Sequence, residues 1–210
     1  MIKKYVTTCD ACQRNKPTTQ RPAGLLQPLS IPMGRWEDIS VDFILELPES
    51  PNSKNNIIVV FVDRLMKRAH FIAAKNTITA KDFADIFIKE IYKHHGIPKS
   101  ITSDRDSKFI SKFWQEFTKI LKIKANTSTS YHPQTDGQTK RTNRTLQQLL
   151  RNYVNYDQDN WEDLLPLVEF PYNDAIQDST KFSPFFADLG RNPRSTISVL
   201  LNRDQRNESN

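Results

Sequence analysis

Residues 56–74 read NIIVVFVDRLMKRAHFIAA, and this stretch decides the fold class. Its two halves, 56–63 and 67–74, are rich in apolar and β-branched residues and are typical of β-strands. The turn between them, DRLMK, is short enough to make the two strands neighbours. A third strand-like run, ISVDFILELP, precedes them at 39–48 and ends at a proline. Three strands joined by short loops predict an antiparallel meander.

Downstream of the meander, the apolar spacing changes to that of helices. Residues 79–96 begin with a capping box, Thr79 and Asp82, and end at a glycine that is followed by Pro98. Two further strand-like runs and three further helical runs follow, at 99–103 (strand), 111–123 (helix), 124–130 (strand), 138–153 (helix) and 160–170 (helix). This order predicts an α/β domain with a mixed five-stranded sheet flanked by helices.

The composition supports one packed domain with a basic surface. Of the 210 residues, 37% are hydrophobic, which is enough for a core. A net charge of +6 and a pI of about 9.3 favour polyanionic partners. The longest apolar run is too short to cross a bilayer, and the N-terminus has no signal-peptide pattern. We therefore expect a soluble intracellular protein with no membrane partner.

Changes in composition along the chain predict four segments. They are a basic segment (1–16), a proline-rich linker (17–35), the α/β core (36–195) and a polar tail (196–210). The first segment holds Cys9 and Cys12 in a CxxC motif, whose thiolates supply half of a tetrahedral zinc site. All four histidines lie far downstream. The motif is an incomplete zinc site, a redox pair or two separate thiols, and the sequence leaves these alternatives open.

Two acids stand where a sheet could bring them together. Asp42 interrupts an apolar strand, where a carboxylate is costly to bury unless a cation such as a metal pairs with it. The alternative is a solvated face of that strand. Asp104 stands at a strand end, and Asp106 nearby has the position of a turn-former. Two such acids can share divalent metal ions for in-line phosphoryl transfer, but the site needs a further carboxylate.

Seven motifs along the chain resemble the integrase of gypsy-type LTR retrotransposons, a retroviral-type integrase with an RNase H-like core. They are CDACQRNK, WEDISVDFI, VVFVDRLMKRAHFI, HHGIPKSITSDRDSKFIS, YHPQTDGQTKRTNRTL, WEDLLPLVEFPYN and SPFFADLGRNPR. The resemblance covers most of the chain. It implies an enzyme that processes DNA 3′ ends and joins them to target DNA, acts as a homo-oligomer and works in the nucleus.

In that family three acids, spaced D, D, 35 residues, E, bind two Mg²⁺ (or Mn²⁺) ions. The resemblance assigns the first two to Asp42 and Asp104 as metal-binding and catalytic residues. The third position is 140, where this sequence has Lys140. The family's zinc-binding histidine pair, upstream of the CxxC, is absent from the sequence, so we expect no Zn²⁺ on Cys9 and Cys12.

A lysine at position 140 changes the chemistry expected of the site. A protonated lysine has three donors and no lone pair, so it cannot ligate Mg²⁺. At about 5 Å and an effective dielectric near 20, each unit-charge pair is worth roughly 3 kcal/mol. We expect Lys140 to weaken metal binding, to pair with Asp42 and Asp104 in the metal's place, and to impair catalysis. Asp136 is a weak candidate for replacing the lost acid.

The substitution fits a degenerate copy of an element. A Glu-to-Lys change needs one base, and Pro171 stands in EFPYN where the family has EFAYN. A proline inside that helix removes a backbone donor and costs about 3 kcal/mol unless the helix kinks or ends there. The open alternatives are an integrase that is active despite Lys140, a non-enzymatic nucleic-acid-binding module and, as a weaker rival, an RNase H-like nuclease.

The helix that follows position 138 has the pattern of a DNA-contacting element. Its predicted buried face comprises Leu146, Leu149, Leu150 and Tyr153. Its polar stripe comprises Lys140, Arg144, Gln148 and Arg151, and the simple alternative is a solvated face. The resemblance favours phosphate contacts with element ends and target DNA. The expected DNA-binding residues are His132, Gln134, Lys140, Arg141, Arg144 and Arg151.

Overall fold

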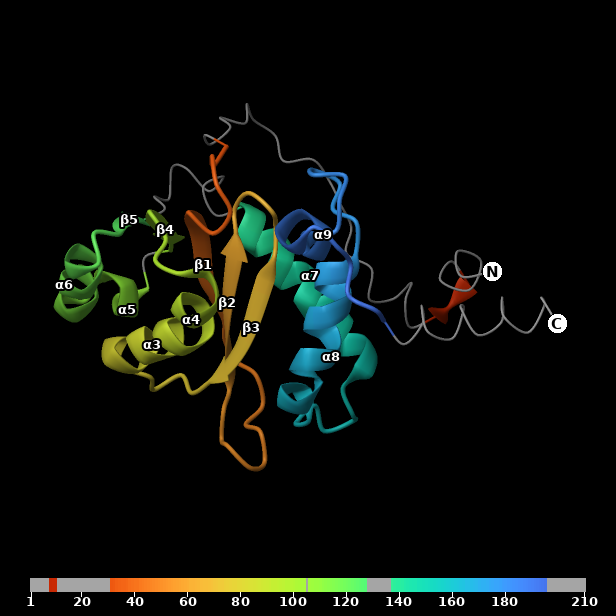
Figure 1. The fold of residues 1–210 in the computed structure, drawn as a ribbon. Helices are drawn as coiled ribbons and strands as arrows, with labels where there is room; N and C mark the ends of the chain where they lie inside the picture. Colours follow the sequence, from red (N-terminus) through yellow and green to blue (C-terminus); the bar gives the residue numbers. More distant parts are fainter. Residues whose placement is uncertain (1–7, 11–30, 105, 128–136, 196–210) are drawn as a thin grey trace, which may run out of the picture.

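The computed structural model describes residues 8–10, 31–104, 106–127 and 137–195, and omits the side chains at 107, 108, 127 and 137–140. Its centre is a five-stranded sheet of order β3-β2-β1-β4-β5 (Figure 1). The strands are β1 (Asp38–Ile44), β2 (Ile57–Asp63), β3 (Ala69–Ala74), β4 (Ser100–Ser103) and β5 (Lys124–Thr127). The first three strands pair antiparallel, while β4 pairs parallel with β1 and β5 parallel with β4. The predicted meander and the mixed sheet are confirmed.

Helices cover both faces of the sheet, and this explains why β2 is apolar throughout. All seven residues of β2 are buried. Alternate residues enter two separate cores, because successive side chains of a strand point to opposite faces. Phe61 packs in the first core with Phe83 and Trp114, whereas Val60 packs in the second with Leu146 and Trp161.

The first face is covered by helices that flank β4 in the sequence. They are α3 (Ala80–Phe87), the π-helical turn η1 (Ile88–Tyr92), α4 (Lys93–His95), α5 (Ser107–Ile110) and α6 (Lys112–Ile120). The predicted capping box is present: the Thr79 hydroxyl accepts from the amide of Asp82, and the Asp82 carboxylate accepts from the amide of Thr79. The helical run ends at Gly96, whose φ of +80° is a conformation that glycine adopts without strain.

The second face is covered by α7 (Gly137–Tyr153) and α8 (Trp161–Asp174), with α9 (Pro184–Leu189) following (Figure 1). Helix α8 continues to Asp174 although Pro171 lies within it. Helices α5 and α9 were not among the predicted elements. For α9 a local signal exists, since Ser183 caps the amide of Phe186 and Pro184 occupies the first helical position.

The buried face of α7 follows the predicted spacing for all but its last member. Leu146 and Leu150 are buried and Leu149 is half-buried. Tyr153 was predicted to be buried but is 64% exposed. It is the last residue of α7, where the chain leaves the sheet and turns toward α8. None of the helices within the described ranges is long and apolar enough to cross a membrane.

Candidate active site

Asp42 lies in β1 on the face that α7 covers. Its neighbour Ile44 packs in the core beneath α7, whereas Val41 and Phe43 belong to the opposite core. Asp42 is half-buried, so the alternative of a simple solvated strand face does not describe it. Its Oδ1 accepts from the amide of Phe43 at 2.9 Å. The strand therefore presents one carboxylate toward α7 from the middle of the sheet.

The register between β1 and β4 indicates where Asp104 lies relative to Asp42. The parallel ladder pairs Asp38 with Ser100 and Ser40 with Thr102. Two residues beyond the last of these pairs stand Asp42, within β1, and Asp104, one residue past the end of β4. Neighbouring strands lie about 4.8 Å apart, and residues two apart point to the same face. From this register we expect the two predicted acids to lie close together on the α7 side of the sheet.

Asp104 also fixes the turn that follows β4. Its Oδ1 accepts from the amide of Asp106 at 2.9 Å, an Asx-type turn. The carbonyl of Asp106 in turn accepts from the amide of Phe109 at 3.0 Å, within α5. The carboxylate that forms this turn is that of Asp104, whereas the prediction gave the turn-forming role to Asp106.

Asn143 on α7 contacts Asp42 directly, and the sequence analysis missed it. Its Nδ2 donates to Oδ2 of Asp42 at 2.8 Å, across 101 residues of sequence. Its Oδ1 is buried with no hydrogen-bond partner within the described part of the chain. An unpaired buried acceptor costs roughly 1–3 kcal/mol, so this oxygen is suited to accept a further hydrogen bond. The available signal was its spacing, three residues after position 140.

That contact also orients position 140. Lys140 is the fourth residue of α7, and its backbone is helical. Residues three apart lie on the same side of a helix, so position 140 stands one turn before Asn143 on the side that approaches Asp42. The side chain of Lys140 lies outside the described atoms. The backbone nevertheless places position 140 near Asp42, which we group with Asp104 as the acid pair. The resemblance assigns the third acid to position 140.

Comparisons with known proteins identify related sequences and folds. Residues 32–133 match the family model described as Integrase core domain. The chain is 40% identical over 184 residues to the Transposon Tf2-3 and Tf2-4 polyproteins of Schizosaccharomyces pombe. That alignment covers 88% of this chain and 14% of each polyprotein, so the chain spans about one seventh of the length of these relatives.

Two solved structures share the fold at low sequence identity. The simian T-cell lymphotropic virus intasome in complex with PP2A regulatory subunit B56 gamma gives a TM-score of 0.61 at 20% identity, covering 92% of this chain and 69% of that one. The HTLV-2 integrase catalytic core domain in complex with magnesium (trimeric form) gives 0.57 at 19% identity, covering 73% and 96%. Together these matches support a retroviral-type integrase core for the described domain. Its RNase H-like fold is confirmed.

The donor set of this integrase core does not fit a complete magnesium site. Asp42 and Asp104 supply hard oxygen ligands of the kind that Mg²⁺ prefers. Position 140 supplies a lysine, which has no lone pair while protonated. Within the described ranges, no group of three or more His, Cys, Asp or Glu is arranged to hold a metal. Of the three ligand positions that the resemblance implies, two carry acids and the third carries a lysine.

The predicted DNA-binding residues divide into two groups. Arg141, Arg144 and Arg151 are exposed on α7, whereas Gln148 of the predicted polar stripe is half-buried. His132 and Gln134 lie outside the described residues, as do Asp136 and Cys12. Cys9 is described and is half-buried. The described arginines thus present cationic groups along one helix of the integrase core.

A second polar cluster lies at the other side of the meander, around edge strand β3. We call it the histidine cluster; its members are Trp36, His70, His95 and Glu169. His70 Nε2 lies 2.9 Å from His95 Nε2, and His70 Nδ1 lies 3.1 Å from Glu169 Oε1. The ring of Trp36 stacks on that of His95 with centroids 3.6 Å apart. Burial, followed by repulsion from His70 and Arg68, lowers the pKa of His95 to about 3.

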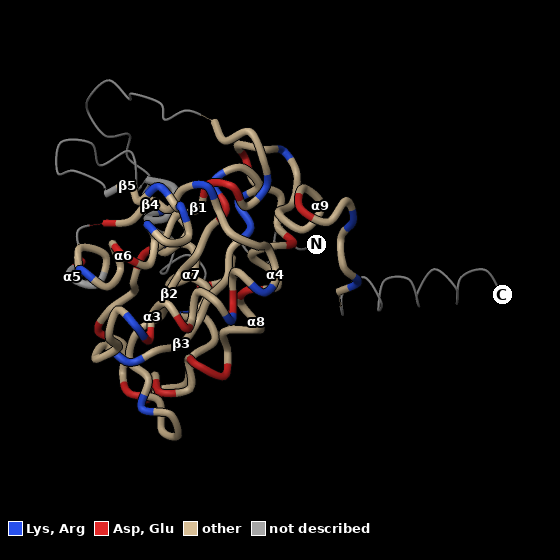
Figure 2. The backbone as a smooth tube through the Cα atoms, turned by 60° about the vertical axis from the view of Figure 1, so that its left-hand side comes forward, with Lys and Arg blue, Asp and Glu red and all other residues tan. Residues whose placement is uncertain are grey.

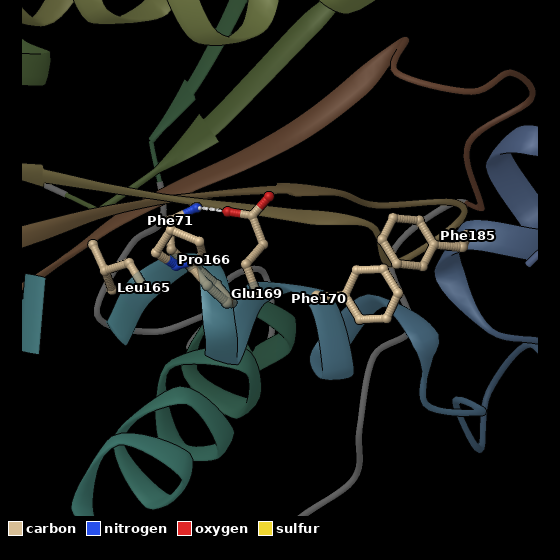
Figure 3. A pocket seen from close by; sticks show the side chains of 6 residues that line it. All are labelled: Phe71, Leu165, Pro166, Glu169, Phe170 and Phe185. Carbon is tan, nitrogen blue, oxygen red and sulfur yellow. Dashed lines mark hydrogen bonds between the residues drawn. The ribbon is translucent and has the colours of Figure 1, made fainter. Parts of the chain in front are cut away.

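Glu169 joins the histidine cluster to a pocket between β3, α8 and α9. The pocket has a volume of about 330 Å³ and is lined by Phe71, Leu165, Pro166, Glu169, Phe170 and Phe185 (Figure 3). The Glu169 Oε2 accepts from the amide of Phe71 at 2.9 Å, so the carboxylate is engaged with β3. The remaining lining is apolar. The pocket therefore brings no reactive group to its surface and is separate from the acid pair.

Proposed function

We propose that this chain is the integrase core of a gypsy-type LTR retrotransposon polyprotein. Its function by descent is the processing of DNA 3′ ends and their joining to target DNA, in the nucleus and as a homo-oligomer. The observation that carries the proposal is the contact of Asp42 with Asn143 of α7, and from the β1–β4 register we expect Asp104 to lie nearby. The family match and the fold of the two integrase structures support it.

The proposal includes impaired catalysis. Asn143 fixes the approach of α7 to Asp42, so position 140 enters the acid pair's surroundings as part of a helix and cannot move away freely. A lysine there offers a positive charge where the family uses a carboxylate to hold Mg²⁺ (or Mn²⁺). Each unit-charge repulsion at about 5 Å costs roughly 3 kcal/mol at an effective dielectric near 20. This cost comes in addition to the loss of one ligand.

A strand-transfer assay on the 210-residue chain tests the proposal. A labelled duplex with the element's terminal sequence is incubated with target plasmid and Mg²⁺. We expect background product from the parent chain and at least about 100-fold more from Lys140→Glu. Lys140→Gln, which removes the charge without supplying a ligand, is the matched control and stays near background. Adding Asp42→Asn to Lys140→Glu returns the product to background.

Two outcomes contradict this reading. Parent activity equal to that of Lys140→Glu identifies a working integrase that tolerates the lysine. A folded Lys140→Glu variant without any product supports the second candidate, a non-enzymatic DNA-binding module. The exposed Arg141, Arg144 and Arg151 on α7 favour that candidate, since cationic groups along a helix suit contacts with DNA phosphates.

A further inference from the structure

A buried hydrogen bond joins α7 to α8 beside the candidate active site. The hydroxyl of Thr142 lies 2.9 Å from the hydroxyl of Tyr172, and either oxygen can donate. Thr142 is 3% exposed and Tyr172 is 6% exposed. Both hydroxyls have thus lost water, and the bond between them offsets part of that cost. The bond lies one residue before Asn143, which donates to Asp42.

Thr142 is the polar member of the face by which α7 packs on the sheet. Four and eight residues after it, Leu146 and Leu150 are buried in the second core. Residues four apart lie on the same side of a helix, so these three side chains share one face. Among residues 141–145, Thr142 alone is buried. A valine would fill a similar space, so burial alone does not call for a hydroxyl at this position.

The hydrogen bonds of two successive residues fix how α7 is rotated about its axis. Neighbouring residues of an α-helix point about 100° apart. Thr142 therefore faces α8 while Asn143 faces β1. Apolar contacts such as those of Leu146 have no preferred direction, whereas a hydrogen bond weakens steeply as its angle departs from linear. The bond at Thr142 thus constrains the direction in which Asn143 reaches Asp42.

Tyr172 is itself held against the edge of the sheet. Its ring packs edge-on against that of Phe71 in β3, with centroids 5.5 Å apart. The next residue, Asn173, accepts from the amide of Ala69 and donates to the carbonyl of Ala69, both at 2.9 Å. Helix α8 contacts β3 and α7, and α7 contacts β1 (Figures 1 and 2). The edge strand β3 therefore positions α7 through α8.

We propose that Tyr172 is a positioning residue for the candidate active site. Its hydrogen bond to Thr142 sets the rotation of α7, and that rotation sets the direction of the bond from Asn143 to Asp42. The inference rests on the proposed function, because it assigns Asp42 to strand transfer. A misplacement of about 1 Å at a catalytic group can lower a rate about 100-fold, so a residue that acts only through others affects the reaction.

Solution NMR of the metal-free parent chain tests the inference apart from catalysis. The side-chain amide of Asn143 is assigned as the pair of ¹⁵N-coupled signals that is missing from Asn143→Ala. In the parent chain, we expect its bond to Asp42 to separate this pair from the signals of a free asparagine. In the double variant Thr142→Val with Tyr172→Phe, the pair should move towards the free position. Thr142→Ser keeps the hydroxyl and should keep the parent signals.

The double variant also separates positioning from stability. It removes both hydroxyls together, so no buried oxygen of this pair is left without a partner. Its free energy of unfolding in urea titrations should therefore stay close to that of the parent chain. Thr142→Val alone leaves the Tyr172 hydroxyl buried and unpaired, and this variant should be less stable than the double variant.

Strand transfer in the Lys140→Glu background measures the effect on the reaction. We expect the double variant to lower kcat about three- to tenfold and to leave KM for the DNA duplex unchanged, because it changes orientation and no contact with DNA. Thr142→Ser should retain the kcat of Lys140→Glu alone. Thr145→Val is the matched control, since Thr145 is exposed on the same helix and its hydroxyl donates to the carbonyl of Arg141. It should leave kcat unchanged.

The outcomes separate this inference from the proposed function. A double variant with the parent signals of Asn143 and an unchanged kcat overturns the inference and leaves the proposed function in place. If Lys140→Glu gives no product, the proposed function is overturned, and the NMR comparison still decides whether Tyr172 orients Asn143. If the double variant does not fold, Tyr172→Phe, which deletes a single oxygen, carries both measurements.

Discussion

The acid pair and the histidine cluster are two polar regions in contact with the same meander, and they are built in different ways. In the histidine cluster, Glu169 and His70 use their polar atoms on partners inside the protein. At the acid pair, the partner of Asp42 is Asn143, whose own Oδ1 is buried and unpaired within the described residues. The first arrangement joins β3, α4 and α8 to one another. The second leaves the Oδ1 of Asn143 able to accept a hydrogen bond from another group, as a ligand-binding site requires.

The largest expected effect concerns Asn143, and the contrast between the two regions fails if Asn143 is dispensable for strand transfer. In the Lys140→Glu background, we expect Asn143→Ala to lower the initial rate of strand transfer about 10- to 100-fold, because Asp42 loses the group that orients it. Gln147→Ala, an exposed change on the same helix, is the control and leaves the rate unchanged. If Asn143→Ala combined with Lys140→Glu has the same rate as Lys140→Glu alone, Asp42 does not need the hydrogen bond from Asn143.

Glu169→Ala is expected to act on stability and not on DNA. The change leaves the amide of Phe71 and the ring of His70 without their carboxylate partner, which should lower the free energy of unfolding by about 1–3 kcal/mol in urea titrations. Glu116→Ala, an exposed change on α6, should alter it little. DNA binding by the folded Glu169→Ala chain should match that of the parent. A loss of binding at unchanged stability would place the histidine cluster in the functional site.

The smallest effect concerns pH. Because the pKa of His95 falls from an ordinary 6.5 to about 3 on folding, the unfolded chain binds more protons between these two values. The free energy of unfolding therefore decreases as pH falls below about 6.5, by less than about 1.4 kcal/mol per pH unit since the ring is half-buried. Urea titrations between pH 7 and pH 5 measure this slope. His95→Gln should flatten it, and an identical slope in that variant would exclude His95 as the source.

The elements that depend on local pattern were predictable from the sequence. The apolar, β-branched composition and the short turn in residues 56–74 predicted the meander, and Thr79 with Asp82 predicted a helix start that the structure confirms. Asp42 and Asp104 were identified one at a time, as an acid in a strand and an acid at a strand end. Their alignment depends on the β1–β4 register, which no local pattern encodes.

The features that were missed depend on packing between distant segments. Asn143 reaches Asp42 across 101 residues, and Glu169 reaches His70 across 99. An asparagine on a polar helix and a glutamate on an amphipathic one look ordinary until the sheet brings their partners close. Tyr153 is the opposite case. Helical spacing predicted that it is buried, but it is exposed at the last position of α7.

The register that aligns the two acids is maintained by residues that take no part in chemistry. In β4, Ile101 is buried in the apolar core with Phe109 and Trp114, while Asp104 follows three residues later. A slip of β4 by one residue would turn Ile101 toward the polar side and Asp104 toward that apolar core. Hydrophobic packing on the opposite face of the sheet thus fixes the register on which the spacing between the acids depends. The apolar contacts beneath β4 therefore stabilise its register whatever residue stands at position 140.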